Sequence, residues 1–304
     1  MHLRPDHAVR DLRTLHAFIR AHPLGVLTTS LPSENHPTLQ CSHIPWVLDS
    51  NPPISPKADL AANANPTKLD NHPPFLGIMR GHIARANPQS KAMIEAVTEA
   101  RAKRTSSSDP DTEQPQGSDL LPEDVMIVFT SPVDHYITPN FYTQGKVGGK
   151  VAPTWNYAAV QVYGRARIYH DSNEGGACTG EFLRSQLTDL ASLGEEGVMG
   201  FRDGSGSQGS GTSSLGEAGG EHSPWKIAEA PKEYIATLLK NIVGMRIEIT
   251  RIEGRFKVSQ ERPGVDRSGV VEGLEGMQSD RAREMAGFVK SGCVVSTSTS
   301  TCDK

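Results

Sequence analysis

The chain has 304 residues, of which 36% are hydrophobic, so it is long enough to bury a substantial core. Its formal net charge of -4 disfavours the bulk positive potential that nucleic-acid-binding proteins use, so direct nucleic-acid binding is not expected. No apolar run approaches the roughly 18 residues of a membrane-spanning helix, and the first residues contain no apolar signal-peptide core. We therefore expect a soluble protein without membrane contact, located in the cytoplasm, with the nucleus as the alternative compartment.

Two kinds of hydrophobic pattern alternate irregularly along the chain. Apolar residues at helical spacing predict helices, and short Val-, Ile- and Thr-rich runs between turn-forming residues predict strands. The expected helices span residues 11–21, a stretch that begins at Asn87-Pro88, 180–193, 232–242 and, near the end, either 264–274 or the charged stretch from Asp280. The expected strands span residues 24–30, 41–48, 75–84, 125–132, 151–169 and 245–260, the last as a strand pair around Glu253-Gly254.

Three stretches of low apolar content predict disordered insertions, at about 49–74, 101–119 and 197–221. Because these insertions interrupt one series of strands, we expect a single domain over residues 1–275, followed by a C-terminal helix and disordered tail over 276–304. The order of the elements favours an antiparallel barrel decorated by helices, a mainly β fold of the α+β class, over alternating parallel βα units.

Aromatic residues concentrate in one window of a chain that is only 6% aromatic. A buried strand is the usual reason for such a cluster, and a wall for a flat, conjugated cofactor is the alternative. The members are Tyr136, Phe141, Tyr142, Trp155, Tyr157 and Tyr163.

Two polar groups are candidates for binding an anion. Arg85 and Asn87 lie where a strand leads into a helix, so they could hold a phosphate or carboxylate, or Asn87 could simply cap the helix. Arg255, Lys257 and Ser259 share one face of a predicted strand, which suits an anionic group but is also typical of a charged outer face. No P-loop or Rossmann glycine pattern occurs, so side chains would have to hold any nucleotide.

None of the 11 histidines has the spacing of a zinc site, and we expect no metal-ion site of that kind. A haem needs only a single histidine ligand and no spacing motif, so this cofactor stays open. His43, His82 and His135 all lie next to predicted strands.

Several long motifs, taken in order, carry a family resemblance. They are GHIARANP at 81–88, HYITPNFY at 135–142, KVAPTWNYAAVQVYG at 150–164, PWKIAEAP at 224–231 and the stretch 241–270. Together they resemble the PaiB family of FMN-binding negative transcriptional regulators, over nearly the whole chain to residue 274. That family has a split β-barrel related to the flavin reductase and pyridoxamine phosphate oxidase barrels. Glu261 departs from the pattern, since it stands where Asn is expected.

The resemblance implies a homodimer with FMN at the subunit interface, and a regulatory role, although no helix-turn-helix pattern is found. It implies that the cofactor pocket is lined by Arg85, Asn87, Trp155, Asn156, Tyr157, Lys257, Ser259 and Gln260. Cations and hydroxyls would hold the phosphate and an aromatic side chain would face the ring.

Haem-dependent piperazate synthases resemble the same family and give an alternative function. They close N5-hydroxyornithine into a cyclic hydrazine, forming an N–N bond. This resemblance implies haem b, with His82 as the first candidate for the axial ligand and His43 as the second. A third reading is an interaction module without cofactor, and in no case does the sequence identify catalytic residues or a small-molecule substrate.

Overall fold

The structure is a computed structural model that describes residues 1–51, 74–106, 119–143, 151–171, 176–202 and 223–294. Most of each predicted disordered insertion, at 52–73, 107–118 and 203–222, lies outside the described residues, as does the end of the tail from 295.

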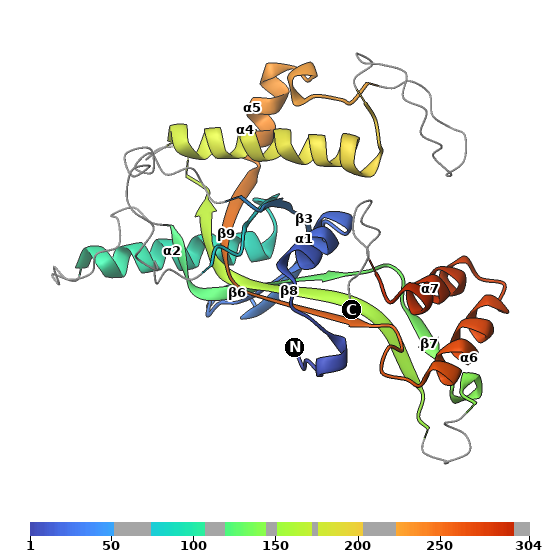
Figure 1. Cartoon of the computed structure of the whole chain (residues 1–304). Coiled ribbons are helices and arrows are strands. Elements are labelled where there is room, and N and C mark those ends of the chain that lie inside the picture. Colours follow the sequence, from blue (N-terminus) through green and yellow to red (C-terminus); the bar gives the residue numbers. More distant parts are fainter. Residues whose placement is uncertain (52–73, 107–118, 144–150, 172–175, 203–222, 295–304) are drawn as a thin grey trace, which may run out of the picture.

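An antiparallel sheet of nine strands forms the centre of the described chain (Figure 1). Its main path runs β3-β2-β6-β8-β9-β5-β4, with β1 added to β9 and β7 added to β8. The strands are β1 (Ala8–Val9), β2 (Leu24–Ser30), β3 (Leu39–Pro45), β4 (Val47–Asp49), β5 (Ile78–Ala84), β6 (Leu120–Thr130), β7 (His135–Ile137), β8 (Thr154–Tyr169) and β9 (Ile242–Lys257).

Helices pack around the sheet. They are α1 (Leu12–Ala21), α2 (Pro88–Ser106), α4 (Gly176–Ser192), α5 (Lys232–Lys240), α6 (Gly264–Glu275) and α7 (Asp280–Ser291), with short turns η1 (Pro5–His7), η3 (Pro139–Phe141), η4 (Leu193–Val198) and η5 (Ile227–Glu229). In the described residues, no helix combines the length and apolar character needed to cross a bilayer.

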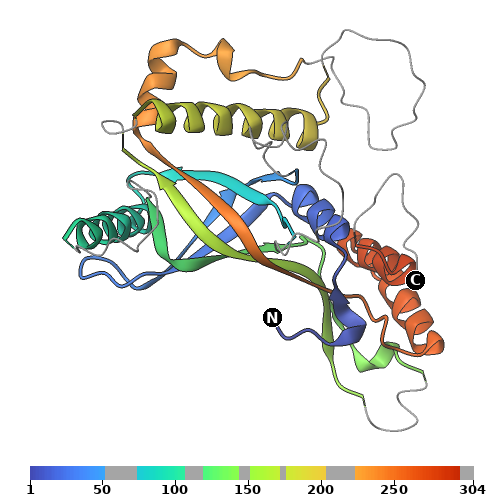
Figure 2. The ribbon, with the colours of Figure 1, turned by 60° about the vertical axis from the view of Figure 1, so that its left-hand side comes forward.

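The sheet curls until strands from its two ends meet (Figure 2). Gly81 of β5 lies so close to the segment after β3 that a Cβ atom there would approach the Trp46 ring to 2.8 Å and Ile44 to 3.3 Å. Trp46 fills the interior at this point, with 1% of its surface exposed. The prediction of a split-barrel, α+β fold is confirmed.

Apolar residues that alternate along the strands fill the barrel, because successive side chains of a strand point to opposite faces. Helix α1 covers one opening, and its Phe18 ring lies 5.1 Å from the Phe256 ring of β9. The fully buried core includes Leu27, Met79, Ile127, Phe129, Val160, Val162, Val243, Met245 and Ile247.

The strand expected at 41–48 is two strands, β3 and β4, which are separated at Trp46 and pair with β2 and β5 at the two ends of the sheet. The structure corrects three further predictions. First, residues 242–257 form one continuous strand and not a pair around Glu253-Gly254, because Gly254 lets β9 pass directly under α1: a Cβ there would lie 2.2 Å from Leu15 Cδ2. Second, α2 continues to Ser106, into the first residues of a predicted disordered insertion. Third, η4 continues to Val198, at the start of another.

Both candidates for the last helix are present, as α6 and α7. They pack on each other, with Arg267 of α6 donating to the Val289 carbonyl of α7 at 2.9 Å. Helix α6 also lies directly on η3, because Gly269 would place a Cβ atom 2.1 Å from the Phe141 carbonyl oxygen. The domain boundary at residue 275 stays a prediction.

Candidate functional site

The predicted pocket residues fall into two groups at opposite ends of the central strands. Arg85 and Asn87 follow β5, where Ala84 pairs with Ile242 at the start of β9. The other six lie where β8 begins and β9 ends, since Tyr157 pairs with Lys257 there. The twelve residue steps from Tyr157 to Tyr169 correspond to up to about 40 Å of strand. One chain therefore does not bring the two groups together.

The start of β8 presents an exposed aromatic surface. Strand β7 pairs with this part of β8 so that Tyr136 lies opposite Trp155, and side chains at opposite positions share one face of a sheet. The two rings contact edge to face at 6.2 Å, although 42% of Tyr136 and 54% of Trp155 is exposed. Exposed aromatic side chains at a strand start are available to a flat ligand.

A hollow of about 370 Å³ lies beside these rings. Its one carboxylate, Asp134, forms an ion pair with Arg281 of α7 at 2.5 Å, so its charge is balanced by the protein. The lining residues are Thr130, Ser131, Asp134, Trp155, Tyr157 and Ala158.

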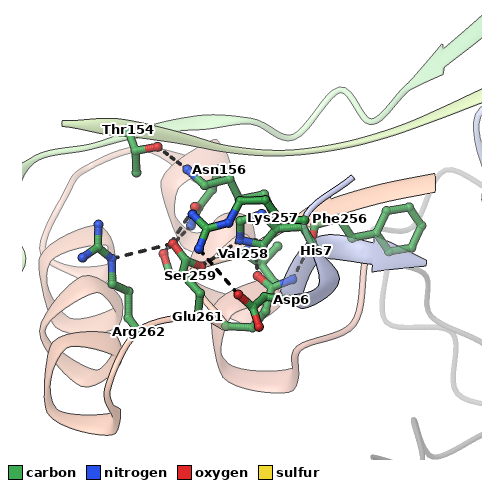
Figure 3. Close-up of polar contacts among 12 residues, drawn as sticks. Asp6, His7, Thr154, Asn156, Phe256, Lys257, Val258, Ser259, Glu261 and Arg262 are labelled. Carbon is green, nitrogen blue, oxygen red and sulfur yellow. Dashed lines mark hydrogen bonds and ion pairs between the residues drawn. The ribbon is translucent and has the colours of Figure 1, made fainter. Parts of the chain in front are cut away.

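A buried group of polar side chains supports the same strand ends (Figure 3). We call Thr154, Asn156, Lys257 and Ser259 the β8–β9 polar cluster. The Lys257 ammonium donates to Thr154 Oγ1 and, at 3.0 Å, to the Trp155 carbonyl. Asn156 Nδ2 donates to Ser259 Oγ at 2.9 Å, and both side chains are fully buried. The cluster therefore fixes the backbone that carries Trp155.

The turn after β9 has an unusual backbone. Ser259 has a φ of 62°, in the left-handed region that non-glycine residues rarely adopt. The Gln260 side chain closes this turn, since its Oε1 accepts from Val258 N at 2.7 Å and its Nε2 donates to the Phe256 carbonyl at 2.5 Å. Gln260 thus makes local backbone contacts.

Cations surround Lys257. Burial lowers the pKa of its ammonium, and the charges of Arg255, Arg262 and Arg4 lower it further, against the opposing charge of Glu261. A dianion placed here would raise this pKa again, because an opposite charge favours the protonated form.

Glu261, the departure from the family pattern, pairs with His7. Burial works against its ionisation, but a backbone hydrogen bond, the bond to His7 and the charge of Lys257 together lower its pKa. His7 Nε2 lies 3.1 Å from Glu261 Oε2. The carboxylate thus occupies part of the positive region.

Several polar atoms in this region are buried without a hydrogen-bond partner in the described residues: Arg255 Nε, Arg262 Nε, Tyr142 Oη and His7 Nδ1. The Arg262 guanidinium also lies 4.5 Å from the centre of the Tyr142 ring. The Glu261 carboxylate, with Oε1 3.7 Å from Arg262 Nε, balances part of this charge. Unpaired buried donors are costly, so an anionic ligand that accepted from the remaining ones would be favoured here. The sequence analysis included Tyr142 only as a member of the aromatic window, and it offered no signal for His7 or Arg262.

At the other end of β8, Arg85 and Asn87 are bound by the protein. Arg85 donates from Nε to the Lys240 carbonyl at 3.0 Å and from Nη2 to the His170 carbonyl at 2.6 Å. Asn87 Oδ1 accepts from Gln89 N at 2.9 Å, which caps α2 as the capping alternative predicted.

The two haem-ligand candidates differ in surroundings. His82 lies on β5 with Nδ1 2.6 Å from Gln186 Oε1 of α4, and burial lowers its pKa, so its neutral form is favoured. His43 is exposed on β3, where it pairs with Val26 of β2. In the described ranges no group of three or more His, Cys, Asp or Glu side chains could hold a metal ion.

Comparison with known proteins places the chain in a family. The family described as "Putative FMN-binding domain" matches residues 1–251. An uncharacterized protein of Aspergillus fumigatus is 40% identical over 293 residues, which cover 95% of this chain and 97% of that protein. Protease synthase and sporulation protein PAI 2 of Bacillus subtilis is 27% identical over 164 residues, 54% of this chain and 61% of that protein.

Solved structures resemble the chain only distantly. The flavocytochrome Anf3 of Azotobacter vinelandii aligns with a TM-score of 0.38 and 12% identity, covering 84% of this chain and 72% of that one. A similarity of this size carries no argument about the site. The family is established by the match over residues 1–251: the chain belongs to this FMN-binding-domain family, the PaiB family that its sequence resembles.

Proposed function

We propose that the protein binds FMN at the start of β8, with the flavin ring against Trp155 and Tyr157 and the phosphate beside Lys257. The observation that carries the proposal is an exposed aromatic surface beside the positive charges of Lys257, Arg255 and Arg262 at one end of the sheet. The Nε atoms of the two arginines are buried without a hydrogen bond in the described residues, although Arg255 Nη1 donates to the His2 carbonyl at 3.0 Å and Arg262 Nε lies 3.7 Å from Glu261 Oε1. FMN has one flat ring and one dianionic phosphate, and each half has a chemically matching surface here.

The residues present fit this cofactor in different ways. Trp155 and Tyr157 line the hollow and could contact the ring directly. Lys257 is 9% exposed, so it acts on the phosphate mainly as a nearby charge and as the residue that fixes the Trp155 carbonyl. Asn156 and Ser259 are fully buried and position the strand ends. Bound FMN would supply one- and two-electron transfer chemistry.

A homodimer is part of the proposal. Trp155 stays largely exposed in the single chain, and a subunit interface would cover it and shield a flavin ring from water. Arg85 and Asn87 would reach this site only from a second subunit. Sedimentation equilibrium tests the assembly: a single species of monomer mass at micromolar concentration would contradict it.

The direct test of the cofactor is reconstitution followed by absorption spectroscopy. Bound FMN should give flavin bands near about 450 nm that remain after gel filtration. Riboflavin lacks the phosphate, so wild-type protein should bind it more weakly than FMN. Equal affinity for the two ligands would contradict a phosphate subsite at Lys257.

Haem is a second candidate because of the geometry at His82. Gln186 Oε1 can only accept, so Nδ1 carries the proton and the neutral ring keeps Nε2 as a potential ligand atom. Haem reconstitution should then give a Soret band near about 400 nm that His82→Ala abolishes. Retention of the Soret band in His82→Ala would show that His82 is not the haem ligand. If the wild-type protein bound neither flavin nor haem, an interaction module without cofactor would be favoured.

A regulatory output is proposed on the family resemblance alone. The net charge of -4 disfavours direct DNA binding, so we propose that any effect on transcription is indirect. Gel-shift assays with genomic fragments at low salt should show no specific complex, and a specific complex would contradict this.

A further inference from the structure

We propose that the protein has a second ligand site, for a small organic dianion such as a phosphate monoester or a dicarboxylate, at the end of β8 that lies far from Trp155. The site is a cavity of about 670 Å³, here called the α4–α5 pocket. It lies where the ends of β5 and β8 meet α4 and the last turn of α5, the two helices at the top of Figure 2. The residues that carry the proposal are Arg85, Gly180, Leu183, Arg184, Leu239 and Lys240.

The charge of the pocket is positive, although the whole chain is acidic. Three cations, Arg85, Arg184 and Lys240, face one carboxylate, Asp171, and the excess of two charges matches a dianion. Within the described part of the chain, neither Arg184 nor Lys240 has an ion pair or a side-chain hydrogen bond. Their charges are therefore available to a ligand.

Arg85 provides a rigid element in this pocket. Its Nε and Nη2 donate to the carbonyls of Lys240 and His170, which come from α5 and from the residue after β8. These bonds hold the planar guanidinium in one orientation, while Nη1 has no partner among the residues that the structure describes. Nη1 is therefore held in place and can donate to a carboxylate or phosphate oxygen with little loss of side-chain entropy.

The pocket also has apolar walls and free space. Leu183 of α4 is buried and Leu239 of α5 is half-buried, so an organic ligand could pack its carbon atoms between the two helices. A Cβ atom added at Gly180 would meet nothing within 4 Å. A larger side chain at this position can therefore fill space without moving the backbone.

This proposal does not depend on FMN binding at the start of β8. Within one chain the two hollows have no lining residue in common, and the strand between them corresponds to up to about 40 Å. Arg85 would reach the flavin site only from a second subunit, so the variants below leave Arg85 unchanged. Variants of one site should leave the other unchanged in a single chain, which gives the experiment its control.

Isothermal titration with three probes tests the site: phenyl phosphate, succinate and, as a neutral analogue, benzyl alcohol. We expect wild-type protein to bind at least one of the two dianions and not benzyl alcohol, and the stronger of the two identifies the ligand class. Lys240→Met and Arg184→Met should each weaken dianion binding on the order of ten-fold. The matched control is Lys232→Met, which removes an exposed charge from the first turn of the same helix and should have no effect.

Gly180→Leu provides a steric test that leaves every charge in place, and it should abolish dianion binding. Three results would overturn the proposal. The first is the absence of binding of either dianion to wild-type protein. The second is an equal loss of dianion binding in Lys232→Met. The third is a parallel loss of FMN affinity in Lys240→Met and Arg184→Met, which would make the pocket part of the flavin site.

Discussion

The buried hydrogen bond between Asn156 and Ser259 gives a quantitative test of the β8–β9 polar cluster. Asn156 is 0% exposed and Ser259 is 1% exposed, and Asn156 Nδ2 donates to Ser259 Oγ at 2.9 Å. Truncating either side chain to alanine leaves the other with a buried polar group that has lost its partner. Each single variant should therefore lose about 1–3 kcal/mol of unfolding free energy.

The double variant should cost less than the sum of the single variants. With Asn156→Ala and Ser259→Ala together no orphaned group remains, so only the net value of the bond, about 0.5–1.5 kcal/mol, and the lost packing are paid. The coupling free energy should then be on the order of 1–3 kcal/mol. The φ of 62° at Ser259 does not confound the cycle, because serine and alanine both carry a Cβ atom there.

Urea denaturation of the four proteins at neutral pH, followed by circular dichroism, measures this coupling. Equal m-values are required for the comparison, since a changed slope would indicate a changed unfolded state. Costs that add within about 0.3–0.5 kcal/mol would show that the two side chains are independent and would refute the cluster as a structural unit.

Three further outcomes are expected. Gly254→Ala should destabilise the protein by about 1–3 kcal/mol, because the new Cβ would lie 2.2 Å from Leu15 Cδ2. Gly287→Ala should stabilise α7, because its new Cβ would meet no atom within 4 Å. Chemical denaturation compares the two variants, and equal effects would contradict the close contact at Gly254. Burial lowers the pKa of His82, so as the pH falls below 6.5 the unfolded chain takes up this proton before the folded chain does, and the unfolding free energy should drop. His82→Gln should flatten the slope of unfolding free energy against pH. An unchanged slope would argue against a buried neutral ring. Trp155→Ala should weaken FMN and riboflavin by the same factor, on the order of ten-fold, because only the ring contact is lost, and a selective loss of FMN in fluorescence titrations would contradict stacking.

Much of the fold follows from local patterns in the sequence. The amphipathic spacing of α1 and the short apolar runs of β2 and β6 are strong signals because each element buries one face. The pairing around Gly254 was wrong for a physical reason: Glu253-Gly254 has the composition of a hairpin turn, but here the glycine makes room for Leu15. Such a close approach depends on an element far away in the chain, which local patterns do not contain.

In the candidate site too, local sequence patterns indicate some features, whereas others depend on contacts between elements far apart in the chain. The aromatic window left a buried strand and a cofactor wall as alternatives; Trp155 is exposed beside β7, whereas Tyr142 of the same window is buried. That Trp155 faces a cofactor stays a prediction. The separation of Arg85 from Lys257 could not be predicted, since both lie at the end of a strand and their distance depends on which ends of β5 and β9 are paired. His7 and Arg262 join the cluster only through tertiary packing of the N-terminal arm and the turn after β9.

The central claim is that FMN binds at the Lys257 end of β8 and not at the Lys240 end. Fluorescence titration of wild type, Lys257→Met and Lys240→Met with FMN tests it directly, because each variant removes one ammonium from one of the two positive regions. Lys257→Met should weaken FMN on the order of 10- to 100-fold, because it removes both a positive charge near the phosphate and the residue that fixes the Trp155 carbonyl, while Lys240→Met should bind FMN as wild type does. The opposite pattern, with FMN affinity lost in Lys240→Met and kept in Lys257→Met, would contradict the account.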